Sequence, residues 1–568
     1  MSYIWQIKDK APKEFLDKFP ELPPIVVQLL YNRELKTQEA IDEFLLPDYS
    51  QDVHDPFLFK DMQRACRRIY EAITKQELIT VYADYDADGV SAAVILKSIL
   101  TDLGAKINVY LPHREKEGYG LNLPAIEEIA KNGTQLIITC DCAISNVEEV
   151  ALANSQGLDV IITDHHAIPL VLPQAYAIIH PQLAGETYPF KFLAGGGVAF
   201  KLAQALLKHA DNKFTVKDSE VKEKWLLDMV AISTVADMVP LLGENRTLVK
   251  HGLIVLRKTR RVGLQLMIKV AGIDTRALDA NSIAFSIAPR INTAGRMDHA
   301  NLAYYLLTTT DPEKATEMAS SLNQNNIDRQ RVTEQIIREA KMQEINLEEK
   351  LLVFYKADWP AGLISLAANR LLREYNRPCL VVCGQGDKIV ASARSFPEFD
   401  INWALEENKN LLERFGGHPQ AAGFTVRQAN YDQLLKNLKN LAEEKLKNVA
   451  LQNKLLVEKN IALSQINWEL LDWLKKFEPY GQANPEPIFS SENVLVSQAR
   501  KVGSDGQHWK LELTQGEKRI GGIAFGQADF DLAIGHRVDL AYNINVNEWN
   551  GNREVQLKIK DLRQHDSR

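Results

Sequence analysis

The sequence predicts an α/β protein in which a doubly wound parallel sheet is followed by a second α/β domain and a small C-terminal β-barrel. Three features predict this fold. From residue 76, short apolar segments alternate with helical patterns, as in buried parallel strands joined by helices. A long charged helical pattern begins near residue 312 and separates this region from further strands. From about residue 455, short strands alternate apolar and polar residues, as the strands of a small barrel do.

Length and composition favour a multidomain protein. The chain has 568 residues, 45% of them hydrophobic, which corresponds to about three or four domains. A net charge of −7 argues against coating nucleic acid through bulk charge, although a local basic groove stays open. No run of about 18 apolar residues predicts a membrane span, and MSYIWQIKDK lacks a signal-peptide core. Five scattered cysteines favour reduced thiols, so we expect a cytoplasmic protein away from membranes.

Residues 1–75 are expected to form helices that serve packing. Ile25–Tyr31 is an apolar run, Thr37 is a plausible cap of the next helix, and Met62–Ile73 has apolar residues at helical spacing. No chemistry is evident here.

Residues 76–311 are expected to form the parallel-sheet domain. Four segments read as its strands: Leu78–Ala83, Lys106–Leu111, Gln135–Cys140 and Asp159–Thr163. In sheets of this kind, ligands gather beyond the carboxyl ends of the strands.

The first of these strands runs into an acidic turn, YADYDADG, which carries Asp84, Asp86 and Asp88. Three carboxylates this close repel one another unless a cation lies among them. A solvated acidic turn is the alternative, but the flanking strand and helix are expected to be buried. The turn therefore predicts a metal site.

Two more strands end in residues of the same kind. Asp141 follows the third strand, and Asp164, His165 and His166 follow the fourth. Taken singly, such an aspartate is often a helix cap and such a histidine an ordinary packed residue. Because three strand ends carry carboxylate or imidazole, we expect a shared metal site at one edge of the sheet. Cys140 and Cys142 flank Asp141, and we expect them to pack in the core rather than to bind zinc.

The run Gly195-Gly196-Gly197 opens another helix. These glycines are compatible with approach to a phosphate or with close packing, and local sequence does not decide between them. Asp237, in STVADMVP, ends a helical stretch and by itself indicates nothing further.

The second α/β domain is expected over residues 349–450, after a connecting helix over 312–348. Helices are expected at Leu363–Arg373 and Asn402–Arg414. The glycines of Phe415-Gly416-Gly417-His418 suit a backbone near a phosphate or a tight turn. Arg394 is either a phosphate fork or an ordinary surface arginine.

Residues 455–568 have the alternation of a barrel of roughly OB-fold size. Trp509, Phe525 and Trp549 could stack on bases, or they could fill the barrel.

The acidic triplet, Asp141, the Asp164-His165-His166 triplet and Asp237 together resemble the motifs of the DHH phosphoesterases. More narrowly, the chain resembles the RecJ family of single-strand-specific DNA exonucleases, nearly from end to end. The further stretches that carry the resemblance are EGYGLN (117–122), STVADMVPL, PRINTAGRM (289–297), the FGGH and AAG pair, and EPYGQANPEPIF (478–489).

The resemblance implies a DHH domain over 76–311 and a DHHA1 domain over 349–450, joined by the 312–348 helix. It also implies an OB-fold over 455–568, with residues 1–75 packed on the DHH domain. The expected reaction is stepwise 5′-to-3′ hydrolysis of single-stranded DNA to mononucleotides with Mn²⁺ or Mg²⁺ in a two-metal site. Such enzymes act in DNA repair and recombination. A single-strand-binding protein and a helicase are expected partners, and a monomer is expected.

The resemblance also assigns roles to residues. The expected metal ligands are Asp84, Asp86, Asp88, Asp141, His165 and Asp237. Asp141, His165 and His166 are the expected catalytic residues, with Asp141 bridging two ions and His166 either a further metal ligand or the group that protonates the leaving group or holds the phosphate. The expected nucleic-acid contacts are Arg114, Arg290, Arg296, Ser392, Arg394, Gly416, Gly417 and His418.

Four positions depart from the family pattern. Ala83 and Ser233 stand where the family commonly has glycine, and Pro360 and Ser365 replace a histidine and a glycine in the second lobe. Two alternatives stay open. One is a related phosphodiesterase for short RNA or cyclic dinucleotides, which would resemble only the first two lobes. The other is a catalytically inactive scaffold that binds single strands.

Overall fold

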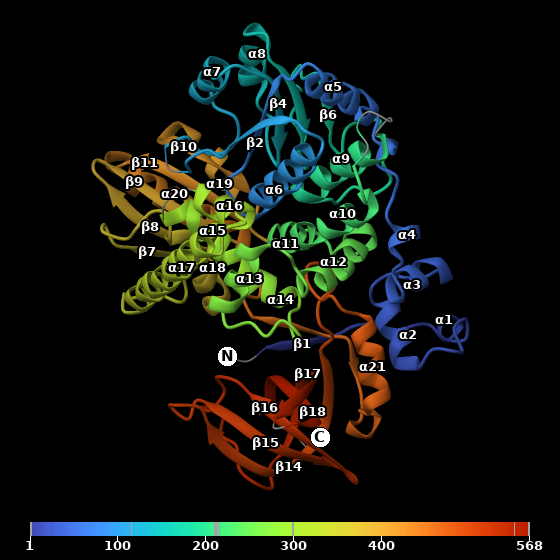
Figure 1. Cartoon of the computed structure of the whole chain (residues 1–568). Coiled ribbons are helices and arrows are strands. Elements are labelled where there is room, and N and C mark those ends of the chain that lie inside the picture. The colour runs from blue at the N-terminus through green and yellow to red at the C-terminus, as the bar shows by residue number, and fades with distance from the viewer. Residues whose placement is uncertain are drawn as a thin grey trace. The chain divides into compact units, whose positions relative to one another are not determined.

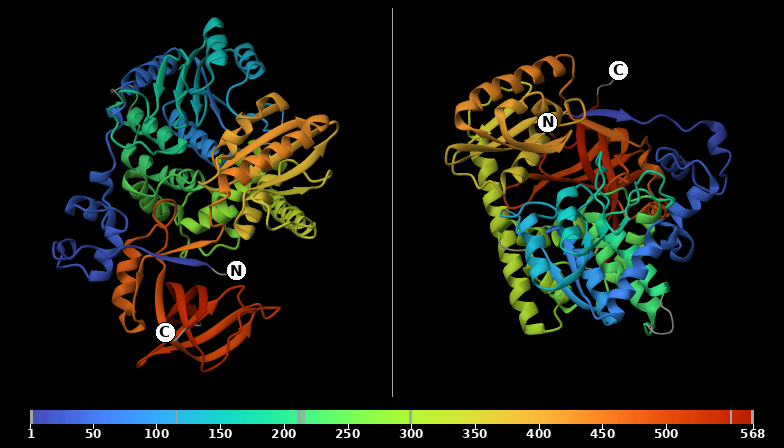
Figure 2. Two further views of the ribbon diagram at one scale, coloured as in Figure 1. Left: turned by 180° about the vertical axis from the view of Figure 1, so that it is seen from behind. Right: turned by 90° about the horizontal axis from the view of Figure 1, so that it is seen from above.

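The computed structural model describes residues 3–114, 116–209, 214, 216–297, 300–549 and 551–565. It divides into two compact units, shown in Figures 1 and 2. One unit is Asn323–Lys454 with the start of the chain as far as Ile4, and the other is Trp5–Leu322 with the chain from Leu455 onward. Each unit is described by itself below.

A five-stranded parallel sheet, in the order β3-β2-β4-β5-β6, forms the centre of the larger unit (Figure 1). Its strands are β2 (Leu78–Ala83), β3 (Lys106–Tyr110), β4 (Thr134–Cys140), β5 (Asp159–Thr163) and β6 (Ala177–Ile179). The four expected strands are therefore present within one residue of their predicted bounds. The doubly wound fold is confirmed, since apolar residues on the two faces of the sheet pack into two separate cores.

Helices cover both faces of this sheet. The core on one face contains residues of α5 (Met62–Thr74), α6 (Ala87–Asp102) and α9 (Gly195–His209). The core on the other face contains residues of α7 (Leu123–Lys131) and α8 (Val147–Ser155). Cys140 and Cys142 are fully buried in these cores, as expected of packing residues.

The N-terminal helices contribute to two cores of the larger unit. Residues of α5 and Phe59 enter the core of the sheet, and Tyr49, Val53 and Phe57 pack against that core. The helices α2 (Pro24–Tyr31) and α3 (Gln38–Leu45), the latter capped by Thr37, share a core with the C-terminal barrel. Their apolar faces thus join the sheet domain to the barrel.

The barrel has five strands: β14 (Phe489–Val502), β15 (His508–Gln515), β16 (Lys518–Ala524), β17 (Arg537–Trp549) and β18 (Asn552–Gln564). Pairing of β14 with β17 closes it, and the OB-fold is confirmed. Trp509 is 9% exposed and packs in the barrel core, whereas Phe525 is 50% exposed. The side chain of Trp549 lies outside the described part of the chain.

A buried arginine joins the sheet domain to the segment that leads into the barrel. Arg246, on α12 (Gly243–Leu256), is 1% exposed. It donates to the carbonyl oxygens of Lys476, Phe477 and Glu478 at distances of 2.7–2.9 Å, and these oxygens lie at the end of α21 (Trp468–Lys476). A cation here satisfies carbonyls that a helix end leaves without partners and complements the helix dipole.

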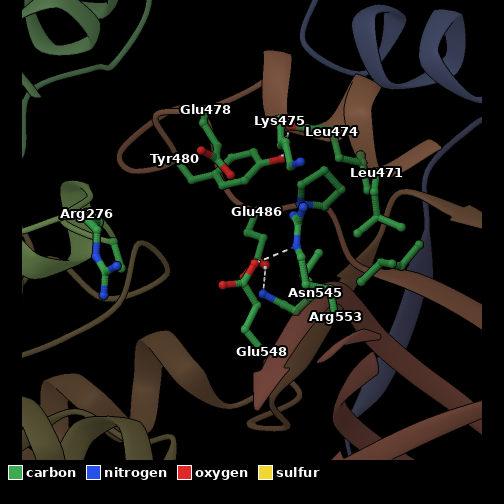
Figure 3. A pocket seen from close by; sticks show the side chains of 14 residues that line it. Arg276, Leu471, Leu474, Lys475, Glu478, Tyr480, Glu486, Asn545, Glu548 and Arg553 are labelled. Atoms are coloured by element: carbon green, nitrogen blue, oxygen red, sulfur yellow. Dashed lines mark hydrogen bonds and ion pairs between the residues drawn. The ribbon is translucent and has the colours of Figure 1, made fainter. Parts of the chain in front are cut away.

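A cavity of about 530 Å³ lies beside the same segment, as Figure 3 shows. Its walls come from α21, the 478–487 segment, the β17–β18 hairpin and Arg276. The metal-site candidates do not line it.

In the described part of the chain, no helix has the length and apolar character needed to cross a membrane.

The smaller unit contains a mixed sheet in the order β10-β11-β9-β8-β7. Its strands are β7 (Leu352–Tyr355), β8 (Cys379–Gln385), β9 (Lys388–Arg394), β10 (Leu412–His418) and β11 (Ala421–Arg427). Its longer helices are α18 (Ile364–Tyr375) and α20 (Gln428–Leu446). The helix α17 (Pro312–Lys341) runs from the larger unit into this one and ends before residue 348.

One expectation for this unit was wrong, and one of two alternatives for its paired glycines is excluded. The helix expected over Asn402–Arg414 is only α19 (Ile401–Glu406), because the chain enters β10 at Leu412. Gly416 and Gly417 lie within β10, opposite Gly423 and Ala422 of β11, so they do not form the tight turn. The turn lies at residues 419–420, between the two paired strands.

Candidate metal centre

The acidic residues meet at one edge of the parallel sheet. Asp84 follows β2, Asp141 follows β4 and Asp164 follows β5, and these three strands are neighbours in the sheet. Asp86 caps the N-terminus of α6, accepting hydrogen bonds from the N–H groups of Asp88 (2.8 Å) and Gly89 (3.1 Å). Parallel strands end at the same edge, so topology alone brings these side chains together.

One group of potential ligands surrounds His165. Its Nε2 atom lies 3.0 Å from Oδ1 of Asp141 and 3.6 Å from Oδ2 of both Asp88 and Asp237. Asp237 comes from the end of α11 (Leu227–Ala236), far along the chain from the strand ends. Asp88, His165 and Asp237 offer ligand atoms within 4.8 Å of one another, as do Asp141, His165 and His166, and such combinations of carboxylate and imidazole suit a divalent cation.

A second group consists of Asp84, Asp86 and Asp141, which offer ligand atoms within 4.8 Å of one another. Asp141 thus belongs to both groups. Its carboxylate is therefore the one that the two groups have in common. His166 also lies near Asp141, with Nδ1 at 3.7 Å from Oδ1.

The backbone brings Asp141 into this position through an unusual conformation. Its φ angle is +60°, in the left-handed region, which aspartate tolerates better than most residues. Its N–H still donates to the carbonyl of Thr163 at 2.9 Å, so the residue stays attached to β5. Gly195 packs directly against its side chain, where a Cβ atom would lie 2.5 Å from Cβ of Asp141. Of the two interpretations of the triple glycine, close packing is the one observed.

Asp88 is 1% exposed and is held by three donors. The N–H of Gly195 donates to Oδ2 at 2.7 Å, and the N–H of Gly196 donates to Oδ1 at 2.7 Å. The hydroxyl of Ser233 donates to Oδ1 at 2.6 Å. The two amides belong to the first turn of α9, where the helix dipole favours a negative charge.

Asp164 orients the two histidines rather than facing a ligand. It accepts from the N–H groups of Ile144, His165 and His166, and from Nδ1 of His166 at 2.8 Å. Burial opposes ionisation, but the hydrogen bond and the charge of His166 outweigh it and lower the pKa of Asp164. The same contact overcomes burial at His166 and raises its pKa to about 9. Nε2 of His166 is thereby left for another partner.

For the remaining carboxyls, burial and like charge outweigh the positive charges nearby. Burial, followed by the nearest carboxylate, raises the pKa of Asp84, Asp86 and Asp141. The same causes raise the pKa of Asp237 to about 8. Oδ1 of Asp84 is buried and has no hydrogen-bond partner in the described part of the chain. An orphaned buried oxygen among repelling carboxyls is what a bound cation would satisfy, so these residues fit a divalent metal.

Three residues of this centre were not singled out from the sequence. The hydroxyl of Tyr119 lies 3.0 Å from Nδ1 of His166 and 3.2 Å from the carbonyl of Asp141. Buried His180 lies with Nε2 2.8 Å from the carbonyl of His166 and accepts from the N–H of Gln182, so it supports the backbone of the pair. Asn292 accepts from the N–H of Ala87 at 2.7 Å, beside the acidic turn. Tyr119 and Asn292 had a signal, since they lie in the EGYGLN and PRINTAGRM stretches, whereas His180 had none.

The arginines expected near the metal site have different surroundings. The guanidinium of Arg114 lies 5.1 Å from the ring centre of Tyr85, between two of the acidic residues, and its charge lowers the pKa of Asp84 against the larger effect of burial. Arg290, on α15 (Ala288–Met297), donates to the carbonyl of Ser286 at 2.7 Å. The side chain of Arg296 lies outside the described residues.

The other expected nucleic-acid contacts belong to the smaller unit. One row of paired residues across β9, β11 and β10 consists of Ser392, Gly423 and Gly416. Two residues further along β9, another row consists of Arg394, Ala421 and His418. Side chains two residues apart share a face, so Arg394 and His418 flank a strip that small residues leave open. Nη1 of Arg394 donates to Oγ of Ser392 at 3.1 Å, which fixes the guanidinium on this face. Gly417 is one residue further along β10, at a position that belongs to the opposite face of the sheet.

Comparison with known proteins agrees with this geometry. The DHH family N-terminal domain matches residues 78–234, the DHHA1 domain matches 348–444, and the RecJ OB domain matches 457–561. The chain is 36% identical over 565 residues to the single-stranded-DNA-specific exonuclease RecJ of Bacillus subtilis, covering 98% of this chain and 70% of that protein. It is 30% identical over 585 residues to RecJ of Escherichia coli, covering 98% and 99%.

The structure of RecJ from Thermus thermophilus in complex with Mn²⁺ superimposes with a TM-score of 0.85 at 27% identity, covering 100% of this chain and 80% of that one. The Mg²⁺ complex of the same protein gives a TM-score of 0.78. Fold and site thus define a DHH-type phosphoesterase with a DHHA1 domain and an OB barrel. Within that class, the chain belongs to the RecJ family.

Proposed function

We propose that this protein is a metal-dependent exonuclease that degrades single-stranded DNA from the 5′ end to mononucleotides. The observation that carries the proposal is the pair of ligand groups that share Asp141 at the carboxyl edge of the sheet. Full-length similarity to proteins named single-stranded-DNA-specific exonucleases supports the substrate class. Repair and recombination of DNA are the processes such an activity serves.

Hydrolysis of a phosphodiester needs an activated water, neutralised charge on the phosphoryl oxygens and a stabilised leaving oxygen. Mn²⁺ or Mg²⁺ ions bound as a pair supply these functions. Asp88, Asp141, His165 and Asp237 would hold one ion, and Asp84, Asp86 and Asp141 the other. Mixed carboxylate and imidazole ligands suit Mn²⁺ somewhat better than an all-oxygen site would.

His166 would act on the substrate rather than hold an ion alone. Asp164 binds Nδ1 and keeps the imidazolium favoured, so Nε2 can donate to a phosphoryl or leaving oxygen. The hydroxyl of Tyr119 lies 3.0 Å from Nδ1 of His166. Tyr119 is 48% exposed, so its ring borders the space in front of His166. These contacts set the orientation of the proton donor before the substrate arrives.

Three surfaces supply contacts for the strand. We assign Arg114, beside the acidic turn, and Arg394, on the open strip of the smaller unit's sheet, to phosphate oxygens of the strand. We assign Arg290 to the scissile region. On the barrel, the lining of a cavity of about 620 Å³ includes the basic Arg500, Lys510 and Arg519, the acidic Glu512 and Glu554, and the apolar Ile520 and Ile534. Basic side chains interleaved with apolar ones suit a single strand.

Other parts of the proposal concern context. A single-strand-binding protein and a helicase are the partners we propose, with the enzyme acting as a monomer. All five cysteines are buried and free, which agrees with a reducing compartment, and we place the activity in the cytoplasm.

The test is a time course on an oligonucleotide carrying a 5′ label, single-stranded or in duplex, with Mn²⁺ or with chelator. The expected result is metal-dependent release of label as mononucleotide from the single strand only. A matched strand labelled at the 3′ end should lose its label last. Release from the 3′ end first would overturn the polarity.

Two outcomes would select the alternatives. Preferential cleavage of a dinucleotide or a cyclic dinucleotide over the long strand would indicate a small-substrate phosphodiesterase. Binding of the strand without turnover in Mn²⁺ would indicate a scaffold. An Asp141→Asn protein serves as the inactive control in each assay.

A further inference from the structure

Ser233 stands where the family that this chain resembles commonly has glycine, and its side chain reaches a metal ligand. It lies on α11, one turn before Asp237, and is 0% exposed. Its hydroxyl donates to Oδ1 of Asp88 at 2.6 Å. The two helices that carry the residues bring a buried hydroxyl onto a buried carboxylate, away from competing water.

The donors around Asp88 leave it little freedom to bind an ion. A carboxylate offers about four acceptor positions, two on each oxygen. On Oδ1 these face the N–H of Gly196 and the hydroxyl of Ser233, and on Oδ2 one faces the N–H of Gly195. Among the described residues, the position left over is on Oδ2, the atom that lies 3.6 Å from Nε2 of His165.

We infer that Ser233 restricts Asp88 to binding through one oxygen and thereby makes the His165 ion site discriminate against large cations. This inference rests on the proposed metal-dependent function. Ca²⁺ takes about six to eight oxygen ligands and readily accepts both oxygens of a carboxylate, whereas Mg²⁺ and Mn²⁺ favour octahedral sites of about six. A carboxylate limited to one oxygen removes a ligand that Ca²⁺ would use.

The packing around Ser233 keeps the hydroxyl in place. A Cβ atom at Gly196 would lie 2.6 Å from Cβ of Ser233, so the helix α9 approaches α11 without space between them. Oγ of Ser233 lies 2.4 Å from the same Cβ position, so the hydroxyl fills the space that the glycine leaves above the first turn of α9. Ser233 acts as a positioning residue, since it reaches the ion only through Asp88.

The experiment compares Ser233→Ala and Ser233→Gly with the unchanged protein, all as full chains, by calorimetric titration of Mn²⁺, Mg²⁺ and Ca²⁺. We expect Mn²⁺ affinity to fall by about 10-fold, as when a group that orients a ligand is lost. Ca²⁺ affinity should hold or rise, because Oδ1 becomes available. The ratio of Mn²⁺ to Ca²⁺ affinity should then fall by about 10-fold or more.

Ser91→Ala is the matched control. Ser91 lies on α6 near Asp88 and is fully buried, and its hydroxyl has no hydrogen-bond partner in the described part of the chain. It should leave both affinities unchanged. An unchanged Mn²⁺ to Ca²⁺ ratio in both Ser233 variants would overturn the inference, as would an equal fall for the two ions.

The design separates this inference from the proposed function. Failure of the unchanged protein to bind Mn²⁺ would remove the metal centre itself. Normal binding with no change on substitution of Ser233 would remove only the role assigned to Ser233.

Discussion

Gly195 and Asp141 approach each other so closely that a Cβ atom at position 195 would lie 2.5 Å from Cβ of Asp141. The same glycine donates its N–H to Asp88. One position on α9 therefore fixes two of the acidic residues, one by contact and one by hydrogen bond.

A methyl group at position 195 should consequently disrupt the metal centre. In Gly195→Ala, Asp141 or the start of α9 must shift, and nuclease activity should fall by about 100-fold or more, since ligands of such sites tolerate little displacement. Mn²⁺ titration should show the corresponding loss of affinity. Gly197→Ala, on the same helix, meets only the flexible side chain of Leu193 at 3.3 Å and should keep most activity. Equal behaviour of the two variants would contradict the role given to Gly195.

Removing the negative charge of Asp141 should weaken the binding of both ions. Removing the negative charge of Asp86 should weaken the binding of one ion. Asp141 belongs to both ligand groups and Asp86 only to the second. We expect Asp141→Asn to abolish tight binding of two Mn²⁺ ions, and Asp86→Asn to leave one ion bound at His165. The stoichiometry from calorimetry measures this difference. Two tightly bound ions in Asp141→Asn would show that the residue does not bridge.

Much of this centre was predictable because strand ends in a parallel sheet share an edge. Asp84, Asp141 and Asp164 each follow an apolar strand whose bounds the sequence indicates, so their convergence follows from topology. Asp237 could not be placed in this way. It ends a helix and reaches the site only through packing of α11 against α6, which no local pattern encodes.

The support around the ligands was also hidden from the sequence. Whether a triple glycine binds a phosphate or packs closely depends on what faces it, and here it faces Asp88 and Asp141. The β10 strand was missed for a related reason. Its two glycines favour a turn locally, but pairing with β11 keeps them extended.

Substitution of His166 should separate catalysis from metal binding. Its Nδ1 is bound to Asp164, and His165 supplies the imidazole that three carboxylates surround. We expect His166→Ala to lower kcat by about 100-fold, as loss of a general acid does, with Mn²⁺ affinity nearly unchanged. His165→Ala should instead weaken Mn²⁺ binding. A similar loss of Mn²⁺ binding in both variants would show that His166 is a necessary ligand.

The metal-free protein should become less stable as pH rises. Burial and neighbouring carboxylates raise the pKa of Asp84, Asp86, Asp141 and Asp237 in the folded state, the last to about 8. In the unfolded chain such carboxyls titrate near 3.9, so between about pH 4 and 8 the folded state holds more protons. The free energy of unfolding then falls as pH rises through this window.

Thermal unfolding in chelator and in Mn²⁺ at several pH values measures this effect. Mn²⁺ requires ionised ligands, so its stabilisation should be larger at pH 8 than at pH 5. Asp237→Asn should flatten the decline in chelator between pH 6 and 8. A Mn²⁺ stabilisation that does not depend on pH would contradict the expectation.

Arg246 should be among the most costly residues to replace outside the metal centre. Its guanidinium donates to Phe44, Lys476, Phe477 and Glu478, and it lies 3.9 Å from the ring centre of Phe44. Arg246→Met keeps most of the volume but leaves these buried carbonyls without donors, which should lower the free energy of unfolding by about 3 kcal/mol or more. Urea unfolding measures the loss. Arg276→Met is the control, because Arg276 is exposed and, among the described residues, forms its ion pair with Asp274, and the urea midpoint should stay nearly unchanged. If the two variants unfold at the same urea concentration, the end of α21 does not depend on Arg246.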